Sequence, residues 1–143
     1  MMDGPSSSEL RAFYERYIEA FNTRDRDGFV DCFDLPVTVM RLGADGAPVA
    51  TTTVTEPDDL WPALPATWTH STIDEVRPIG GDTFSPRPGF VAVPRRAALE
   101  VTVTRWAGEV AYEQFHVLYL LTIEGGRPRI ASMMPLAAAY PAS

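Results

Sequence analysis

The stretch R-Y-I-E-A-F-N-T-R-D-R-D-G-F-V-D-C-F, residues 16–33, contains the end of one predicted helix, a break and the start of a second. Upstream, apolar residues recur at i, i+3, i+4, i+7, i+8 and i+11 with charged residues between them, which predicts a long amphipathic helix packed on a core. The apolar stripe consists of Leu10, Phe13, Tyr14, Tyr17, Ile18 and Phe21. Ser6 stands three residues before Glu9, the spacing of a capping box, so we expect the helix to begin there.

Downstream of the stripe, the residues indicate a short second helix. Asn22 and Thr23 interrupt the apolar pattern, and Asp25 is a residue type that caps helix N-termini. Phe29 lies on the shorter apolar face that follows. We expect Pro36 to end this helix, since proline disrupts a helix interior.

From Val37 onward, apolar and polar residues alternate with a period of two, which predicts β-strands. A turn signal over residues 43–46 predicts a hairpin, so we expect the returning strand to be an edge strand. The proline at the start of that strand is tolerated there, because an edge strand can lack one backbone donor. The predicted strands cover residues 37–42, 48–53, 68–79, 98–106, 110–123 and 128–134, with a short proline-bounded helix near 57–61. Four prolines and three glycines between Pro78 and Arg96 predict a long loop there.

This order of elements predicts one α+β domain over residues 1–143, with a curved antiparallel sheet packed on the long N-terminal helix. A net charge of −7 disfavours nucleic-acid and anionic membrane partners. Cys32 is the single cysteine, which excludes an internal disulfide and a cysteine-based metal cluster. With no apolar run of about 18 residues and no basic leader, we expect a cytoplasmic protein.

Residues 16–33 resemble the opening of the nuclear transport factor 2-like superfamily, which includes ketosteroid isomerases, SnoaL-type polyketide cyclases and scytalone dehydratase. The resemblance is best over residues 10–42 and over the closing hairpin, 119–134. It implies a conical half-barrel with a deep apolar pocket, often in a dimer joined through sheet faces. It does not by itself imply a reaction.

The resemblance also suggests catalytic candidates. The R-Y-(V/I)-x-A-(L/F)-N string aligns Tyr17 with the tyrosine that donates a hydrogen bond to the oxyanion in ketosteroid isomerases. The isomerases' general-base Asp falls at Arg41, and a guanidinium does not abstract protons at neutral pH, which disfavours steroid-type isomerisation. His70 aligns with a pocket His of scytalone dehydratase. That enzyme's Asp is replaced by Asn22, and its second His has no counterpart in residues 98–106.

His116 interrupts an apolar row formed with Leu118 and Leu120, and a buried imidazole needs a partner or a purpose. Both histidines titrate near neutrality, so His116 and His70 are candidates for general acid and base if they share a cavity. Each is equally open to interpretation as an ordinary core or surface histidine, and Tyr17 as a core aromatic residue. Two histidines alone do not form a metal site, so we expect no metal and no cofactor.

The candidates for substrate binding are the large apolar side chains of the predicted pocket and two polar ones near it. They are Phe13, Phe21, Trp61, Trp68, Leu118, Arg41 and Asp74. Asp74 falls on the face of His70 and could orient its ring, although a surface carboxylate is the commoner explanation. Arg41 and Arg105 could recognise an acidic substrate group; we favour the alternative, that they balance acidic residues at a dimer interface.

The sequence therefore favours a small cofactor-independent enzyme of the isomerase, cyclase or dehydratase kind that acts on a small hydrophobic molecule. The alternative is a non-catalytic module that uses the same pocket for binding or dimerisation. We expect a homodimer through the outer sheet face, with Phe115, Val117 and Tyr119 at the interface. We expect the loop over residues 80–94 to act as a rim or lid of the pocket.

Overall fold

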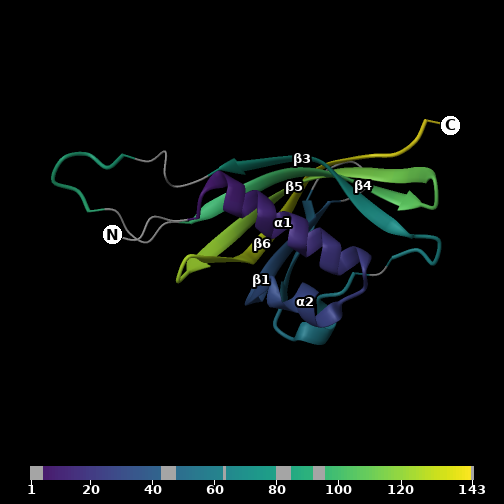
Figure 1. The fold of residues 1–143 in the computed structure, drawn as a ribbon, viewed down its shortest axis with the longest axis horizontal. Helices are drawn as coiled ribbons and strands as arrows, with labels where there is room; N and C mark the ends of the chain where they lie inside the picture. Colours follow the sequence, from purple (N-terminus) through teal and green to yellow (C-terminus); the bar gives the residue numbers. More distant parts are fainter. Residues whose placement is uncertain (1–4, 43–47, 63, 80–84, 92–95, 143) are drawn as a thin grey trace.

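The computed structural model describes residues 5–42, 48–62, 64–79, 85–91 and 96–142, without the side chains of 41, 42 and 48–50. Two helices, α1 (Ser7–Asn22) and α2 (Arg26–Asp31), precede a six-stranded sheet and a 3-10 turn, η1 (Pro57–Asp59). The strands are β1 (Phe33–Leu42), β2 (Pro48–Val54), β3 (His70–Ile79), β4 (Ala97–Ala107), β5 (Val110–Glu124) and β6 (Arg127–Ala139). Figure 1 shows α1 lying across the strands β3 to β6.

The predicted capping signals are confirmed at both helices. The Ser6 hydroxyl accepts a hydrogen bond from the Glu9 backbone N–H at 3.2 Å, and the Glu9 carboxylate accepts one from the Ser6 N–H at 3.3 Å. Asp25 caps α2 through the Gly28 N–H at 3.1 Å. All six residues of the predicted apolar stripe on α1 are buried.

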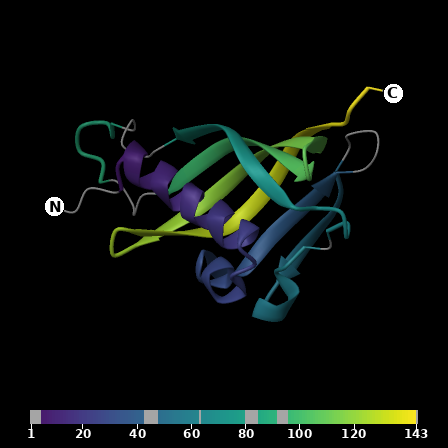
Figure 2. The ribbon, with the colours of Figure 1, turned by 45° about the vertical axis from the view of Figure 1, so that its right-hand side comes forward.

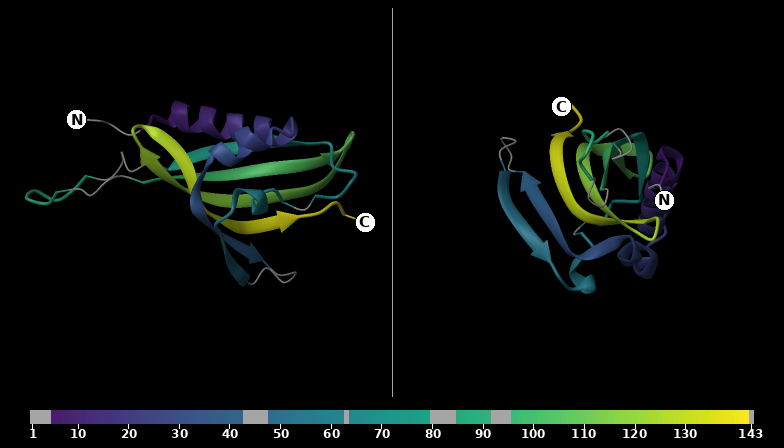
Figure 3. Two further views of the ribbon diagram at one scale, coloured as in Figure 1. Left: turned by 90° about the horizontal axis from the view of Figure 1, so that it is seen from below. Right: turned by 90° about the vertical axis from the view of Figure 1, so that its left-hand side faces the viewer.

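The sheet order is β2-β1-β6-β5-β4-β3, and every neighbouring pair is antiparallel except β1 and β6, which run parallel. The expectation of a wholly antiparallel sheet is therefore corrected at one pair. Alternation along a strand predicts its faces but says nothing of the direction of its neighbour. The turned view shows β1 and β2 diverging from the other four strands, and the view along the long axis shows how strongly the sheet bends (Figures 2 and 3).

Pro36 lies inside β1, which corrects the expectation that it ends the second helix. That helix already ends at Asp31, and β1 begins at Phe33. The register between β1 and β6 shifts between Phe33 and Thr38, and Pro36 lies in this irregular segment. A proline is tolerated there because a shifted register does not require its missing N–H. The predicted turn over 43–46 lies outside the described residues.

The C-terminal end of α1 is fixed to the start of β3 by the Asn22 side chain. Its amide N donates to the Ser71 carbonyl at 2.9 Å, and its amide O accepts from the Ser71 N–H at 2.8 Å. The sheet leaves the N–H and the carbonyl of Ser71 without a strand partner on this side, and Asn22 forms a hydrogen bond with each of them. This junction holds the end of α1 over the concave face of the sheet, where the candidate functional site lies.

Candidate functional site

A cavity of about 210 Å³ opens between α1, α2 and the concave face of the sheet, and we call it the aromatic cavity. Its walls come from both helices, from β1 to β6 and from the segment around η1. The residues that line it include Tyr17, Phe21, Phe29, Phe33, Val39, Val54, Asp59, Trp61, Ser71, Val103, Arg105, Phe115, Tyr119 and Met133. Residues from so many elements converge because the bent sheet faces the helices across an incompletely filled core.

Trp61 is placed by the prolines around η1. Pro57 occupies the first turn of η1, where a proline loses no hydrogen bond, and Pro62 prevents the turn from continuing. The Trp61 ring stacks on Phe21 with centroids 5.0 Å apart and an interplanar angle of 15°. It meets Phe29 edge-on, also at 5.0 Å. Trp61 therefore packs on aromatic residues of both helices.

Three tyrosines from α1 and β5 form a cluster beside the cavity. The hydroxyls of Tyr14 and Tyr119 share a hydrogen bond of 3.2 Å, and the Tyr17 ring lies edge-on to Tyr119 with centroids 5.9 Å apart. Burial raises the pKa of Tyr14 and Tyr17 well above the usual value, and the neighbouring Tyr119 raises both further. Burial also raises the pKa of Tyr119. All three are therefore neutral phenols at pH 7 and act as hydrogen-bond donors or acceptors, not as bases.

Arg105 brings a positive charge to the cavity wall. Its Nη1 donates to Glu113 Oε1 at 2.9 Å across the β4–β5 pair, and its guanidinium carbon lies 4.7 Å from the Phe115 ring centroid. Its Nε is buried and has no hydrogen-bond partner among the residues that the structure describes. Sequence reasoning favoured a dimer-interface role for Arg105, whereas the structure places it among the residues that line the cavity. The sequence did contain a signal for this position, because Arg105 falls on the same face of the alternating strand as Val101 and Val103.

Of the aromatic residues predicted to bind substrate, Phe21 and Trp61 line the cavity, as does the catalytic candidate Tyr17. Phe13 and Trp68 are buried in the core but do not line the cavity. The Trp68 indole N–H donates to the Ser71 hydroxyl at 3.2 Å. Phe13 and Trp68 therefore pack in the core, outside the aromatic cavity.

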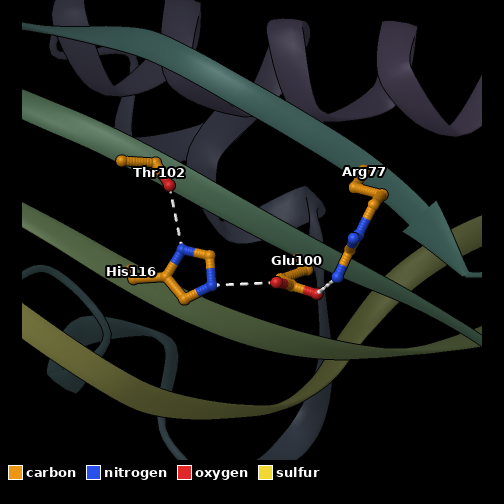
Figure 4. A network of polar contacts seen from close by, with 4 residues as sticks. All are labelled: Arg77, Glu100, Thr102 and His116. Atoms are coloured by element: carbon orange, nitrogen blue, oxygen red, sulfur yellow. Dashed lines mark hydrogen bonds and ion pairs between the residues drawn. The ribbon is translucent and has the colours of Figure 1, made fainter.

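His116 does not face the aromatic cavity. It pairs with Thr102 in the β4–β5 register, on the sheet face opposite the buried Val101 and Val117. Figure 4 shows its ring between Thr102, 2.8 Å from Nδ1, and Glu100, 3.0 Å from Nε2; Glu100 in turn pairs with Arg77. His116 therefore does not meet the condition under which it and His70 were candidates for general acid and base, a shared cavity, because both faces of β5 carry apolar residues and the aromatic cavity lies on the other face.

His70 lies on the same outer face, paired with Trp106 and stacked on its ring with centroids 5.9 Å apart. Its Nδ1 is 2.9 Å from the Thr69 hydroxyl. Asp74 does not orient this ring: its carboxylate accepts hydrogen bonds from Thr104 at 2.5 Å and from Gln114 at 3.1 Å. Each histidine thus has its own partners on the outer face, and the role of both in catalysis stays a prediction.

Leu118 also lies on the outer face, opposite Glu100 on one side and Met134 on the other, so it does not line the cavity. Conversely, the predicted interface residues Phe115, Val117 and Tyr119 lie on the inner face: Val117 and Tyr119 are buried, and Phe115 lines the cavity. The assignment of the two faces of β5 was therefore reversed. The side chain of Arg41 lies outside the described residues.

The loop predicted as a lid is described only over residues 85–91. This part projects from the end of the molecule at which α1 begins, and none of its residues lines the aromatic cavity (Figure 1). The remainder of the predicted lid, 80–84 and 92–94, lies outside the described residues. The described part thus gives no support to a lid role.

Within the described ranges, no group of three or more His, Cys, Asp or Glu side chains is arranged to hold a metal ion. Cys32 is partly buried, and burial raises its pKa from 9.0 to about 11, with the charge of Asp31 adding to the effect. Its thiol donates to the Gly28 carbonyl at 3.4 Å. None of the helices in the described parts of the chain has the length and apolar character needed to span a membrane.

Comparison with solved structures places this architecture among known folds. The chain is similar to a nuclear transport factor 2-like protein of unknown function from Pseudomonas putida, with 12% identity, a TM-score of 0.62 and coverage of 98% of this chain and 99% of that one. It is also similar to the β subunit of benzoate 1,2-dioxygenase from Burkholderia mallei, with 13% identity, a TM-score of 0.60 and coverage of 94% and 91%.

A third similar structure is a candidate ketosteroid isomerase from Kribbella flavida, with 15% identity, a TM-score of 0.52 and coverage of 93% of this chain and 78% of that one. No family model matches the chain, and no curated protein is significantly similar in sequence. The structural likenesses show that the protein has the nuclear transport factor 2-like fold, a curved sheet packed on a long N-terminal helix. At these identities they show the fold alone.

Proposed function

We propose that the protein binds a small, largely apolar molecule in the aromatic cavity, where Tyr17 donates a hydrogen bond to it. The observation that carries this proposal is the cavity itself, an apolar chamber with a few converging polar groups. Its volume of about 210 Å³ exceeds the roughly 150 Å³ of an engineered cavity that binds benzene and falls below the roughly 300 Å³ of the smallest drug-sized pockets. A ligand of one or two rings fits this size.

Binding is tested by isothermal titration calorimetry with 2-tetralone, a neutral bicyclic ketone, as the probe. Val54 lines the cavity from the edge strand β2, so Val54→Trp fills the cavity from a wall that is only partly buried. We expect this variant to weaken binding at least about tenfold, or 1.4 kcal/mol. The matched control is Val110→Trp, at an exposed position outside the cavity. Equal loss in both variants, or no binding by the unchanged protein, contradicts the proposal.

The enzymatic form of the proposal is cofactor-independent isomerisation or cyclisation, in which Tyr17 stabilises a developing oxyanion. The support for it is that the cavity also contains a carboxylate: Asp59, exposed at the end of η1, is the acidic residue among its described lining residues. A carboxylate base and a phenol donor in one cavity are the groups that proton abstraction next to a carbonyl requires. The likeness to a candidate ketosteroid isomerase is compatible with this chemistry and carries no part of the proposal.

The enzyme and the non-catalytic binding module differ in one measurable respect, the exchange of protons next to a bound carbonyl. We expect the protein to accelerate deuterium exchange at the α-carbon of 2-tetralone in D₂O, followed by proton NMR. Asp59→Asn should reduce the rate by about 10²- to 10⁴-fold, as expected for a general base. Asp58→Asn, at the neighbouring exposed carboxylate that does not line the aromatic cavity, is the matched control and should retain the rate. Binding without any acceleration favours the non-catalytic module.

A further inference from the structure

We propose that the ligand of the aromatic cavity carries a carboxylate group and that Arg105 binds this group. The inference rests on the proposed function, because it specifies the chemistry of the molecule that the cavity takes. It adds a specificity-determining residue that neither the apolar walls nor the tyrosine cluster supplies.

Arg105 has five N–H donors, and its partner in the described structure is Glu113, on Nη1. Nε is buried without a partner, although its side chain as a whole is 24% exposed. A buried N–H that lacks an acceptor is unfavourable, because it has lost its hydrogen bonds to water and gained none. The edge of the guanidinium that carries Nε is therefore suited to an acceptor that the chain itself does not provide.

Arg105 lies on the wall of the cavity. In the strand register, Arg105 lies between Ser71 of β3 and Glu113 of β5, and both Arg105 and Ser71 line the cavity. The Phe115 ring, 4.7 Å from the guanidinium carbon, supports the planar group from one side. The positive charge of Arg105 also acts to lower the pKa of Tyr14, Tyr17 and Tyr119, against the stronger effect of burial. Its field therefore reaches the tyrosine cluster.

A second buried polar atom without a partner lies in the same electrostatic environment. The Tyr112 hydroxyl is buried and unpartnered, and the charge of Arg105 opposes the rise in the Tyr112 pKa that burial causes. Unsatisfied buried groups are uncommon in folded proteins. Tyr112 does not line the aromatic cavity, so Arg105 is the group that would meet an acceptor from outside the chain there.

The chemistry of the site selects a carboxylate over other acceptors. A carboxylate can accept two parallel N–H donors from one edge of a guanidinium, a geometry that gives both strength and orientation. A phosphate dianion is disfavoured, since Glu113 already shares this guanidinium and Asp59 lies on the cavity wall. The remaining walls, including Phe21, Trp61 and Phe115, suit an aromatic body. The site thus fits a monoanion with an aromatic ring next to its carboxylate.

The test compares 2-naphthoate with 2-naphthamide, two probes of nearly equal shape that differ in charge, by isothermal titration calorimetry at pH 7. We expect the unchanged protein to bind the carboxylate at least tenfold more tightly than the amide. Arg105→Met should abolish this preference while changing the affinity for the amide by less than about twofold. Arg77→Met is the matched control, since Arg77 lies on the outer face and pairs with Glu100. It should leave the preference intact.

Glu113→Gln gives an independent test of sign and does not remove the arginine. Losing the internal negative charge frees the guanidinium for the ligand, so we expect tighter binding of 2-naphthoate and unchanged binding of 2-naphthamide. This variant decides the question if Arg105→Met fails to fold, as judged by circular dichroism. Equal affinities for the two probes in the unchanged protein, or weaker naphthoate binding in Glu113→Gln, overturn the inference and leave the proposed function standing. If neither probe binds, the inference fails, and the binding of 2-tetralone decides separately whether the proposed function stands.

Discussion

The hydrogen bond between Tyr14 and Tyr119 joins α1 to β5 at the tyrosine cluster, and its removal should be measurable as a coupling energy. The hydroxyls are 3.2 Å apart, and the two residues are 0% and 2% exposed. Tyr14→Phe leaves the Tyr119 hydroxyl without this partner, and Tyr119→Phe does the same to Tyr14. A buried hydroxyl deprived of its partner costs about 1–3 kcal/mol, so each single variant should lose about that much free energy of unfolding.

The double variant removes both hydroxyls and leaves no unsatisfied group from this pair. Its loss should therefore be about 1–2 kcal/mol smaller than the sum of the two single losses, which is the coupling energy of the cycle. Urea denaturation followed by circular dichroism measures it. At an m value of about 2 kcal/mol/M, a loss of 2 kcal/mol lowers the midpoint by about 1 M. Losses that add within about 0.3 kcal/mol would refute the reasoning.

Three other predictions concern groups outside the cavity or the response to pH. The Cys32 thiol, with its pKa raised to about 11, should react slowly with a disulfide reagent at pH 8 and rapidly once urea unfolds the chain; equal rates would contradict its burial. Since the folded-state pKa values of Tyr14 and Tyr17 are raised, the free energy of unfolding should decrease as pH rises above about 10; a urea midpoint that is constant up to pH 11 would argue against it. We also propose that the protein forms a homodimer through the outer face of the sheet, where Leu120 is 39% exposed. Leu120→Glu should then convert the dimer to a monomer, as measured by light scattering. A monomeric mass for the unchanged protein would exclude this dimer.

The helical part of the fold could be predicted because its signals are local. Ser6 and Glu9 predicted the start of α1, and the spacing of its apolar residues predicted the buried side. The strands were predictable as elements for the same reason. The direction of β1 relative to β6 was not, because a parallel pair and an antiparallel pair have the same alternation.

The error over the candidate site has one physical origin, the two-sided hydrophobicity of β5. Phe115, Val117 and Tyr119 alternate with His116 and the leucines that follow it, so either face could have packed on the helices. If the inward-facing positions of a strand are misassigned by one residue, every side chain of that strand is placed on the wrong face. Only the pairing of Val117 with the buried Val101 resolves the choice, and that contact is not local in sequence.

The central claim is that ligands bind on the inner face of the sheet, and intermolecular NOEs between bound 2-naphthoate and the methyl groups of the protein test it most directly. Side chains on alternate faces of a strand are separated by the sheet, so these contacts report which face is occupied. The account predicts NOEs to Val54, Val103 and Met133, which line the cavity. NOEs to Leu118 or Leu120 of the outer face, without any to those three, would contradict it.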